Sequence, residues 1–214
     1  MIVAREIELA RYLNTRIHLA HISTERSLEL IERAKREKIR VSCETCPHYF
    51  TFSLKDIEDN FDPNLKVNPP LGREEDKEAI KRALSKDIID CIATDHAPHT
   101  YLEKEVTFYE ASFGIIGLEF AFSLSLNLVR EGYLELKDLS RKLSYAPSKI
   151  LGLDDRGEIR EGKRADLVIV DLEKDWRVEI KDIVSKSKNT PLIGKTLKGK
   201  VEYTIYKGRV VYKI

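Results

Sequence analysis

The fold is indicated by the stretch Ile88-Ile89-Asp90-Cys91-Ile92-Ala93-Thr94-Asp95, a short apolar run that ends on a carboxylate. A short run of apolar and β-branched residues between polar segments is typical of a buried strand. Ile17–Ile22 and Ile39–Cys43 have the same character, so the sequence predicts three such strands. Apolar residues at helical spacing occur around them, over Met1–Leu13, Ser27–Arg36 and Glu74–Leu84. Alternating strands and helices predict a parallel sheet with helical crossovers.

Three further helices are predicted after the third strand. They cover Gly114–Arg130, Leu136–Leu143 and Pro147–Leu151. The long connection before Glu74 is expected to carry little regular structure, because Pro47, the Asp62-Pro63-Asn64 turn and Pro69-Pro70 interrupt it. Long loops in compact domains are often functional.

The character of the sequence changes after Gly152. Ala165–Asp171 is predicted to be a strand. Val201–Tyr206 and Arg209–Tyr212 flank Lys207-Gly208, which is typical of a hairpin turn. We therefore expect an α/β part over residues 1–152 and a β-rich part over residues 153–214.

Composition excludes several classes of protein. The 214 residues are 42% hydrophobic and 34% charged, which suits one ordinary domain with a small appendage. A formal net charge of +1 gives no reason to expect nucleic acid or an anionic membrane as a partner. No apolar run has the length of a membrane span. Three cysteines do not make a disulfide framework, so a cytoplasmic location is expected.

Two residues at predicted strand ends are candidates for chemistry. Asp95 follows the third strand, and His21 lies at the end of the first. In α/β barrels the active-site residues gather where strands end, and a carboxylate and an imidazole there could form part of a zinc site. Each residue alone has a plainer interpretation, since a strand-end His is often structural and a strand-end Asp often caps the next helix.

Neighbouring residues strengthen the functional interpretation of Asp95 but do not support a metal site at the cysteine pair. Asp95, His96 and His99 lie within five residues, with Pro98 between the two imidazoles, and this grouping favours function over packing. The pair Cys43 and Cys46 has only His48 nearby, so we interpret both as buried or loop cysteines.

Asn68 ends the long connection. Two prolines follow it and would hold its side-chain amide in a fixed place, but a turn-forming role fits the residue equally well.

Several motifs together resemble those of type I dihydroorotases, in the amidohydrolase superfamily. They are His18–Thr24, Val67–Leu71, Ala93–His99, Gly114–Leu118, Gly162–Leu167 and Lys188–Gly194. Their order and spacing match the family along essentially the whole chain. Hydantoinases and allantoinases share this framework, but they usually differ at the Asn-Pro-Pro and Thr-Asp-His-Ala-Pro-His strings.

The resemblance implies a fold and a reaction. The fold would be the C-terminal part of a (β/α)₈ TIM-type barrel, over residues 1–152, with a β-sandwich piece over residues 153–214. The reaction would be the reversible hydrolysis of dihydroorotate to N-carbamoyl-aspartate in pyrimidine biosynthesis.

The resemblance also implies roles for individual residues. His21 would be a metal ligand, and Asp95 would be both a metal ligand and the catalytic acid and base, in a site holding one or two zinc ions. Asn68, His99 and the backbone near Gly114 would contact the small-molecule substrate.

The chain departs from the family in one large respect. It has only five histidines, and none forms the His-x-His pair that begins the family's metal site. The isolated chain is therefore expected to be inactive without an N-terminal half. Three strands cannot close an eight-stranded barrel, so a protein partner or self-association is expected to cover the open edge.

Three origins of such a chain stay open: a truncation, one piece of a split enzyme, or a fragment that assembles by itself. A non-catalytic, dihydroorotase-like scaffold that associates with another pyrimidine enzyme is the alternative function. Hydantoinase-like hydrolysis of another cyclic amide is a third hypothesis, disfavoured by Asn68 and His99.

Overall fold

The computed structural model describes residues 1–58 and 60–214 and divides into two compact units. The first contains Met1–Leu118 and Ser185–Pro191, and the second contains Glu119–Val184 and Leu192–Ile214. The limits of these compact units differ from the expected domain boundary between residues 152 and 153. The two domains expected from the sequence therefore stay a prediction. Each unit is described by itself below.

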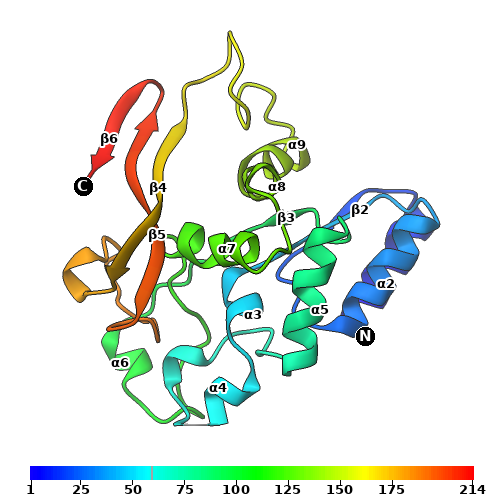
Figure 1. Cartoon of the computed structure of the whole chain (residues 1–214). Helices are drawn as coiled ribbons and strands as arrows, with labels where there is room; N and C mark the ends of the chain where they lie inside the picture. Colours follow the sequence, from blue (N-terminus) through cyan, green and yellow to red (C-terminus); the bar gives the residue numbers. More distant parts are fainter. Residues whose placement is uncertain (59) are drawn as a thin grey trace. The chain divides into compact units, whose positions relative to one another are not determined.

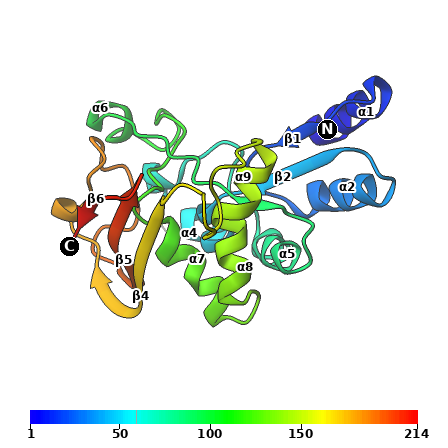
Figure 2. The same ribbon diagram turned by 90° about the horizontal axis from the view of Figure 1, so that it is seen from above.

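A three-stranded parallel sheet forms the centre of the first unit (Figures 1 and 2). Its strands are β1 (Ile17–Leu19), β2 (Val41–Thr45) and β3 (Cys91–Ile92), in the order β1-β2-β3. All three fall at or close to the predicted runs, and the parallel pairing confirms the expectation from strand–helix alternation.

Three long helices accompany this sheet. They are α1 (Ile2–Leu13), α2 (Glu25–Arg36) and α5 (Glu74–Ser85), and α2 contacts both of the others (Figure 2). Helix α2 begins where the Thr24 side chain accepts a hydrogen bond from the backbone N–H of Ser27. Its apolar residues at helical spacing, Leu28 and Ile31, are buried.

The two faces of the sheet differ in character. Leu19 and Cys43 are register partners on one face, and both are buried. His18 and Glu44 belong to the opposite face, where side chains alternate with the buried set. Their side chains keep 29% and 22% of their surface exposed. The sheet thus has a polar face that other described residues cover only in part.

The connection before α5 is more regular than the sequence suggested. It contains α3 (Pro47–Thr51), α4 (Leu54–Glu58) and a 3₁₀ turn (Pro63–Leu65). The expectation of little regular structure was wrong because Pro47 and Pro63 stand at helix starts, where a proline costs no hydrogen bond. A further short helix, α6 (Tyr101–Lys104), follows β3.

The second unit begins with helices. Helix α7 (Ala121–Arg130) is shorter than the predicted Gly114–Arg130, because Gly114 has a φ of 139° and Ile115 pairs with His96 in an isolated bridge. Helix α8 (Leu136–Ser140), a π-helical turn (Arg141–Tyr145) and α9 (Ala146–Ile150) follow.

An antiparallel sheet completes the second unit. Strands β4 (Leu167–Arg177), β5 (Thr196–Tyr206) and β6 (Arg209–Lys213) lie in the order β4-β5-β6, and a 3₁₀ turn (Ile180–Asp182) follows β4. Lys207 and Gly208 form the predicted hairpin turn, both with positive φ. Because it contains helices and two β-sheets, the protein is an α/β protein.

None of the helices in the described ranges is both long and apolar enough to cross a membrane.

Candidate active site

His21 and Asp95 share an unusual backbone conformation just past the ends of β1 and β3. The φ angle is 44° at His21 and 46° at Asp95. Left-handed backbone is uncommon for residues with a side chain, and such residues concentrate at active sites and ligand clamps. The two residues predicted as metal ligands therefore have the same left-handed backbone conformation, just past the C-terminal ends of their strands.

Asp95 belongs to a cluster of three potential metal ligands. The Cys46 sulfur, a ring nitrogen of His48 and a carboxylate oxygen of Asp95 all lie within 4.8 Å of one another. Cys46 and His48 are buried, whereas Asp95 is exposed. Cys46 follows β2 and His48 lies in the first turn of α3, so the cluster forms where β2 and β3 end.

His48 connects this cluster to His21. Burial is the main cause that lowers the pKa of His48 to about 3, and the nearby charge of His21 lowers it further. His48 is thus a neutral imidazole near neutral pH. Burial also raises the pKa of the Cys46 thiol, and the Asp95 carboxylate adds to that effect. The uncharged forms of both side chains are therefore favoured in the absence of a cation.

Two buried ring nitrogens at this end of the sheet lack partners. Neither Nδ1 of His21 nor Nε2 of His48 has a hydrogen-bond partner among the described residues. A buried polar atom without a partner costs free energy, so such atoms call for an explanation. Imidazole nitrogens beside a carboxylate and a thiol are donors that suit zinc. The residues present at the strand ends therefore fit a divalent metal ion.

Sequence reasoning missed His48 and interpreted Cys46 as a structural residue. The burial of Cys43 and Cys46 is confirmed, with both fully inaccessible. What the sequence did not indicate is that α3 begins directly after β2 and carries His48 back toward Asp95. The only available signal was the position of His48 a few residues beyond a predicted strand.

His99 and Gly114, two predicted substrate contacts, lie side by side. A Cβ atom at Gly114 would approach Nε2 of His99 to 2.9 Å, so only glycine permits this distance. The Nε2–H of His99 donates to the carbonyl of Phe113 at 2.7 Å. Its Nδ1 lies 3.6 Å from the Glu103 carboxylate. The ring is therefore held from both sides.

Asn68 is exposed on a loop that is joined to the Gly114 segment. The Gly114 N–H donates to the carbonyl of Lys66 at 2.8 Å, two residues before Asn68. On the other side of Asn68, the carbonyl of Pro69 accepts from the hydroxyl of Tyr49 at 2.7 Å. The structure thus brings the Asn68 loop to the loop that carries Gly114.

Asn189 is a residue whose role the sequence did not indicate, although it lies in the Lys188–Gly194 motif. It is buried, and its Nδ2 donates to the carbonyls of Ala97 at 2.9 Å and Gly114 at 3.2 Å. Its Oδ1 accepts from the backbone N–H of His99 at 3.1 Å. Asn189 therefore links the two loops that carry His99 and Gly114.

The ring of His96 is engaged by backbone N–H groups. Its Nδ1 accepts hydrogen bonds from the N–H groups of Gly117 and Leu118 at 3.1 and 3.3 Å. The proton must then sit on Nε2, which faces the Ser185 hydroxyl at 3.4 Å. The grouping of Asp95, His96 and His99 therefore divides into a candidate ligand, a loop anchor and a candidate substrate contact.

Comparison with known proteins identifies relatives of this arrangement. The sequence profile of the amidohydrolase family matches residues 2–211. A dihydroorotase from Citrifermentans bemidjiense is 48% identical over 99% of this chain and 49% of its own length. A dihydroorotase from Endomicrobium trichonymphae is 46% identical over the whole of this chain and 51% of its own length. The chain thus spans about half the length of the curated relatives that it matches.

Solved structures of hydantoinases have a similar backbone fold. The L-hydantoinase (dihydropyrimidinase) from Arthrobacter aurescens superposes with a TM-score of 0.93 at 30% identity. It covers 99% of this chain, and the match takes in 48% of the hydantoinase chain. A D-hydantoinase structure matches with a TM-score of 0.91 at 25% identity over the same shares.

Proposed function

Because the chain belongs to the amidohydrolase family, we propose that it supplies part of the active site of a dihydroorotase, which hydrolyses dihydroorotate reversibly to N-carbamoyl-aspartate. One observation carries the proposal: the candidate ligands gather where the three parallel strands end, around Asp95. Chemistry at the C-terminal ends of parallel strands is the rule for α/β barrels. Curated relatives at 44–48% identity that are named dihydroorotases support this choice of substrate.

The fold that fits this function is the C-terminal part of a (β/α)₈ barrel, with the antiparallel sheet as a piece of a small β-sandwich. Three parallel strands, with α1 in contact with β1 and α2 in contact with β2, are compatible with part of such a barrel. The polar face with His18 and Glu44 would then point into the barrel. We infer that a further protein segment, from an N-terminal half or a second chain, covers this face. We also infer a cytoplasmic location, because all three cysteines are thiols without disulfide bonds.

In this proposal His21 and Asp95 hold the metal, with His48 and Cys46 close by. A zinc ion there would act as a Lewis acid and lower the pKa of a water molecule. The left-handed backbone at His21 and Asp95 sets the direction in which each side chain leaves the main chain before a metal ion binds.

Asp95 has the properties required of the group that moves the proton. Its carboxylate is exposed, so water and substrate can reach it. We infer that it accepts a proton from the attacking water and delivers that proton to the departing ring nitrogen. The buried His48 and Cys46 are less suited to this task, because the pKa of each is shifted far from neutrality.

Three residues would form the substrate site. The Asn68 amide is exposed and can reach a polar ligand. His99 would contact the substrate only after its ring leaves the Phe113 carbonyl or the Glu103 carboxylate, which occupy it in this structure. Gly114 has both backbone groups engaged, since its N–H donates to Lys66 and its carbonyl accepts from Lys104 and Asn189. Its contribution is therefore the close approach of the His99 ring, which a side chain would prevent.

A hybrid enzyme tests the proposal. This chain replaces the matching segment of the Citrifermentans bemidjiense dihydroorotase, and turnover of dihydroorotate and hydantoin is measured. We expect the hybrid to hydrolyse dihydroorotate and Asp95→Asn to lower its kcat by about 100-fold or more. The matched control is Asp154→Asn, at an exposed carboxylate, and it should leave kcat unchanged. The isolated chain should have negligible activity.

Other outcomes favour other functions. Faster hydrolysis of hydantoin than of dihydroorotate would favour a hydantoinase, which the similarity to solved hydantoinases keeps as the second candidate. A folded hybrid that hydrolyses neither compound would favour a non-catalytic scaffold. Full turnover of dihydroorotate by the isolated chain would overturn the expectation that the site needs a second segment.

A further inference from the structure

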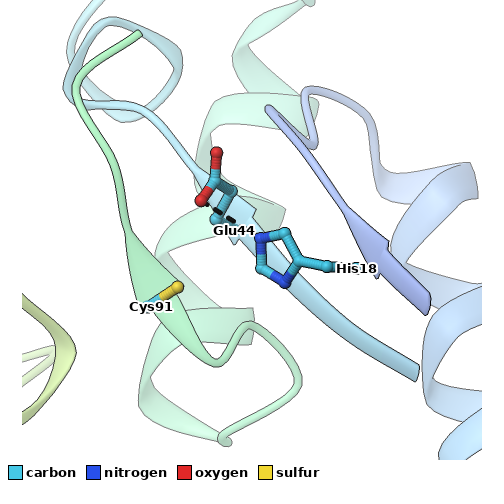
Figure 3. Close-up of side chains that lie close together, drawn as sticks. All are labelled: His18, Glu44 and Cys91. Carbon is cyan, nitrogen blue, oxygen red and sulfur yellow. Dashed lines mark hydrogen bonds and ion pairs between the residues drawn. The ribbon is translucent and has the colours of Figure 1, made fainter. Parts of the chain in front are cut away.

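A second group of potential metal ligands lies on the polar face of the parallel sheet. The Cys91 sulfur, a ring nitrogen of His18 and a carboxylate oxygen of Glu44 are all within 4.8 Å of one another. Each comes from a different strand: His18 from β1, Glu44 from β2 and Cys91 from β3. Figure 3 shows the His18 ring directed at the Glu44 carboxylate, with Cys91 on the neighbouring strand. This three-strand cluster shares no residue with the group formed by Cys46, His48 and Asp95.

Strand register explains why the three side chains meet. Glu44 and Cys91 are directly paired between β2 and β3, so they project from the same face. His18 pairs with Ser42, two residues before Glu44, and residues two apart on a strand share a face. The shared face of the three residues is therefore a consequence of the backbone pairing.

The hydrogen bonds around His18 allow a tautomer in which Nδ1 carries the proton. Nδ1 of His18 lies 2.9 Å from the Ser42 hydroxyl, and that hydroxyl can donate to the carbonyl of Ile17 at 3.4 Å. The Ser42 oxygen then accepts from an Nδ1–H group, which leaves a lone pair on Nε2 of a neutral ring. A hydrogen bond to Nδ1 that fixes the ring and leaves Nε2 available is typical of histidine metal ligands.

Nε2 of His18 lies 3.1 Å from Oε2 of Glu44. In this tautomer two acceptors face each other unless a proton or a cation lies between them, whereas in the other neutral tautomer Nε2–H donates to Glu44. A proton gives an imidazolium–carboxylate ion pair, and a metal ion gives a coordination site. The adjacent thiol of Cys91 adds a third potential ligand atom, and sulfur suits a soft divalent metal.

We propose that His18, Glu44 and Cys91 bind a zinc-class divalent ion that joins the three parallel strands. Neutral imidazole, carboxylate and thiolate are all established zinc ligands, and one carboxylate with one thiolate balances the charge of a divalent ion. The Cys91 thiol releases its proton to solvent as the ion binds. Mg²⁺ and Ca²⁺ do not fit, because both require oxygen ligands. His18 and Glu44 are partly exposed, so an ion can reach the site from solvent.

Cobalt(II) absorption tests the site in the purified 214-residue chain, because a cysteine ligand gives a near-ultraviolet thiolate-to-cobalt band. After treatment with a chelator, the chain is titrated with Co²⁺, and Zn²⁺ is then added in competition. We expect the band in the unaltered chain and in Cys46→Ser, and its loss in Cys91→Ser. His18→Gln, at a partly exposed position, should weaken Co²⁺ binding at least about tenfold, as expected for the loss of one ligand. Circular dichroism checks that each variant is folded.

Three results would overturn the proposal. A band that survives Cys91→Ser and disappears in Cys46→Ser would place the ion at the group formed by Cys46, His48 and Asp95 alone. Absence of the band from the folded, unaltered chain would show that His18 and Glu44 contact each other without a metal at Cys91. Retention of full affinity in folded His18→Gln would likewise remove His18 from the site.

Discussion

The side-chain carbonyl of Asn189 accepts a hydrogen bond from the backbone N–H of His99 at 3.1 Å, across 90 positions of sequence. The same side chain donates to the carbonyls of Ala97 and Gly114. A buried amide that satisfies several backbone groups at once rigidifies the segments that it joins. Asn189 therefore fixes the loops on which two predicted substrate contacts lie.

Replacing Asn189 with alanine should lower the free energy of unfolding by about 1–3 kcal/mol, because buried backbone groups lose their partners. Urea denaturation of the 214-residue chain measures the change. Lys186→Ala, at an exposed position three residues away, is the control and should change stability by less than about 0.5 kcal/mol. Equal effects of the two substitutions would show that Asn189 does not hold these loops.

The left-handed backbone at His21 predicts an unusual order of stability among its variants. Both His21→Gly and His21→Ala remove the imidazole, but only glycine adopts a φ of 44° without steric cost. The glycine variant should therefore be more stable than the alanine variant by about 1 kcal/mol. Thermal unfolding of both proteins measures the difference.

His18, within β1, provides the matched pair for this comparison. Glycine weakens a strand interior, so His18→Gly should be less stable than His18→Ala. If alanine were favoured over glycine at both positions, the backbone at His21 would not be left-handed in solution.

We expect that adding a side chain at Gly199 in β5 destabilises the second unit through a steric clash. Its φ is 83°, and a Cβ atom would lie 2.3 Å from Cδ2 of the buried Leu126. Gly132→Ala is the control, because Gly132 has a φ of 80° with nothing within 4 Å of the added atom. Both variants carry the backbone strain, so Gly199→Ala should cost at least about 1 kcal/mol more, from overpacking. Similar losses in urea unfolding would contradict the close packing of α7 on β5.

We expect the buried Lys104 side chain to make the chain more stable at alkaline pH, relative to a variant that lacks this ammonium group. Its buried ammonium donates to the carbonyls of Ser112 and Gly114. Burial lowers the pKa of Lys104 to about 8 from its ordinary 10.5, while Asp62 and Lys66 have smaller, opposed effects. The unfolded chain binds this proton more tightly than the folded chain does. The resulting penalty is complete below pH 8 and disappears as the pH rises toward 10.5, a change of up to about 3 kcal/mol.

The comparison protein for this prediction is Lys104→Met. The free energy of unfolding of the unaltered chain, minus that of the variant, should increase between about pH 8 and 10. Taking the difference cancels the buried thiols of Cys43 and Cys46, whose raised pKa values act in the opposite direction. A difference that stays constant over this range would show that Lys104 titrates as an exposed lysine.

Much of the fold could be predicted because it depends on local periodicity. Apolar residues at helical spacing located α1, α2 and α5, and short β-branched runs located the three parallel strands. The prediction of helix from Gly114 failed because an apolar segment can be buried without being helical. There, the φ of Gly114 and the bridge between His96 and Ile115 decide the local structure.

By itself, the sequence determined the order of strands and helices, the placement of His21 and Asp95 at strand ends, and the resemblance to a family. These properties follow from residues close together in the chain. Only the tertiary structure decided that Cys46 and His48 join Asp95, that His18, Glu44 and Cys91 share one face, and that Asn189 links two loops. Such contacts depend on strand register and on chain reversals. A shift of one residue in register would turn every side chain of a strand to the opposite face.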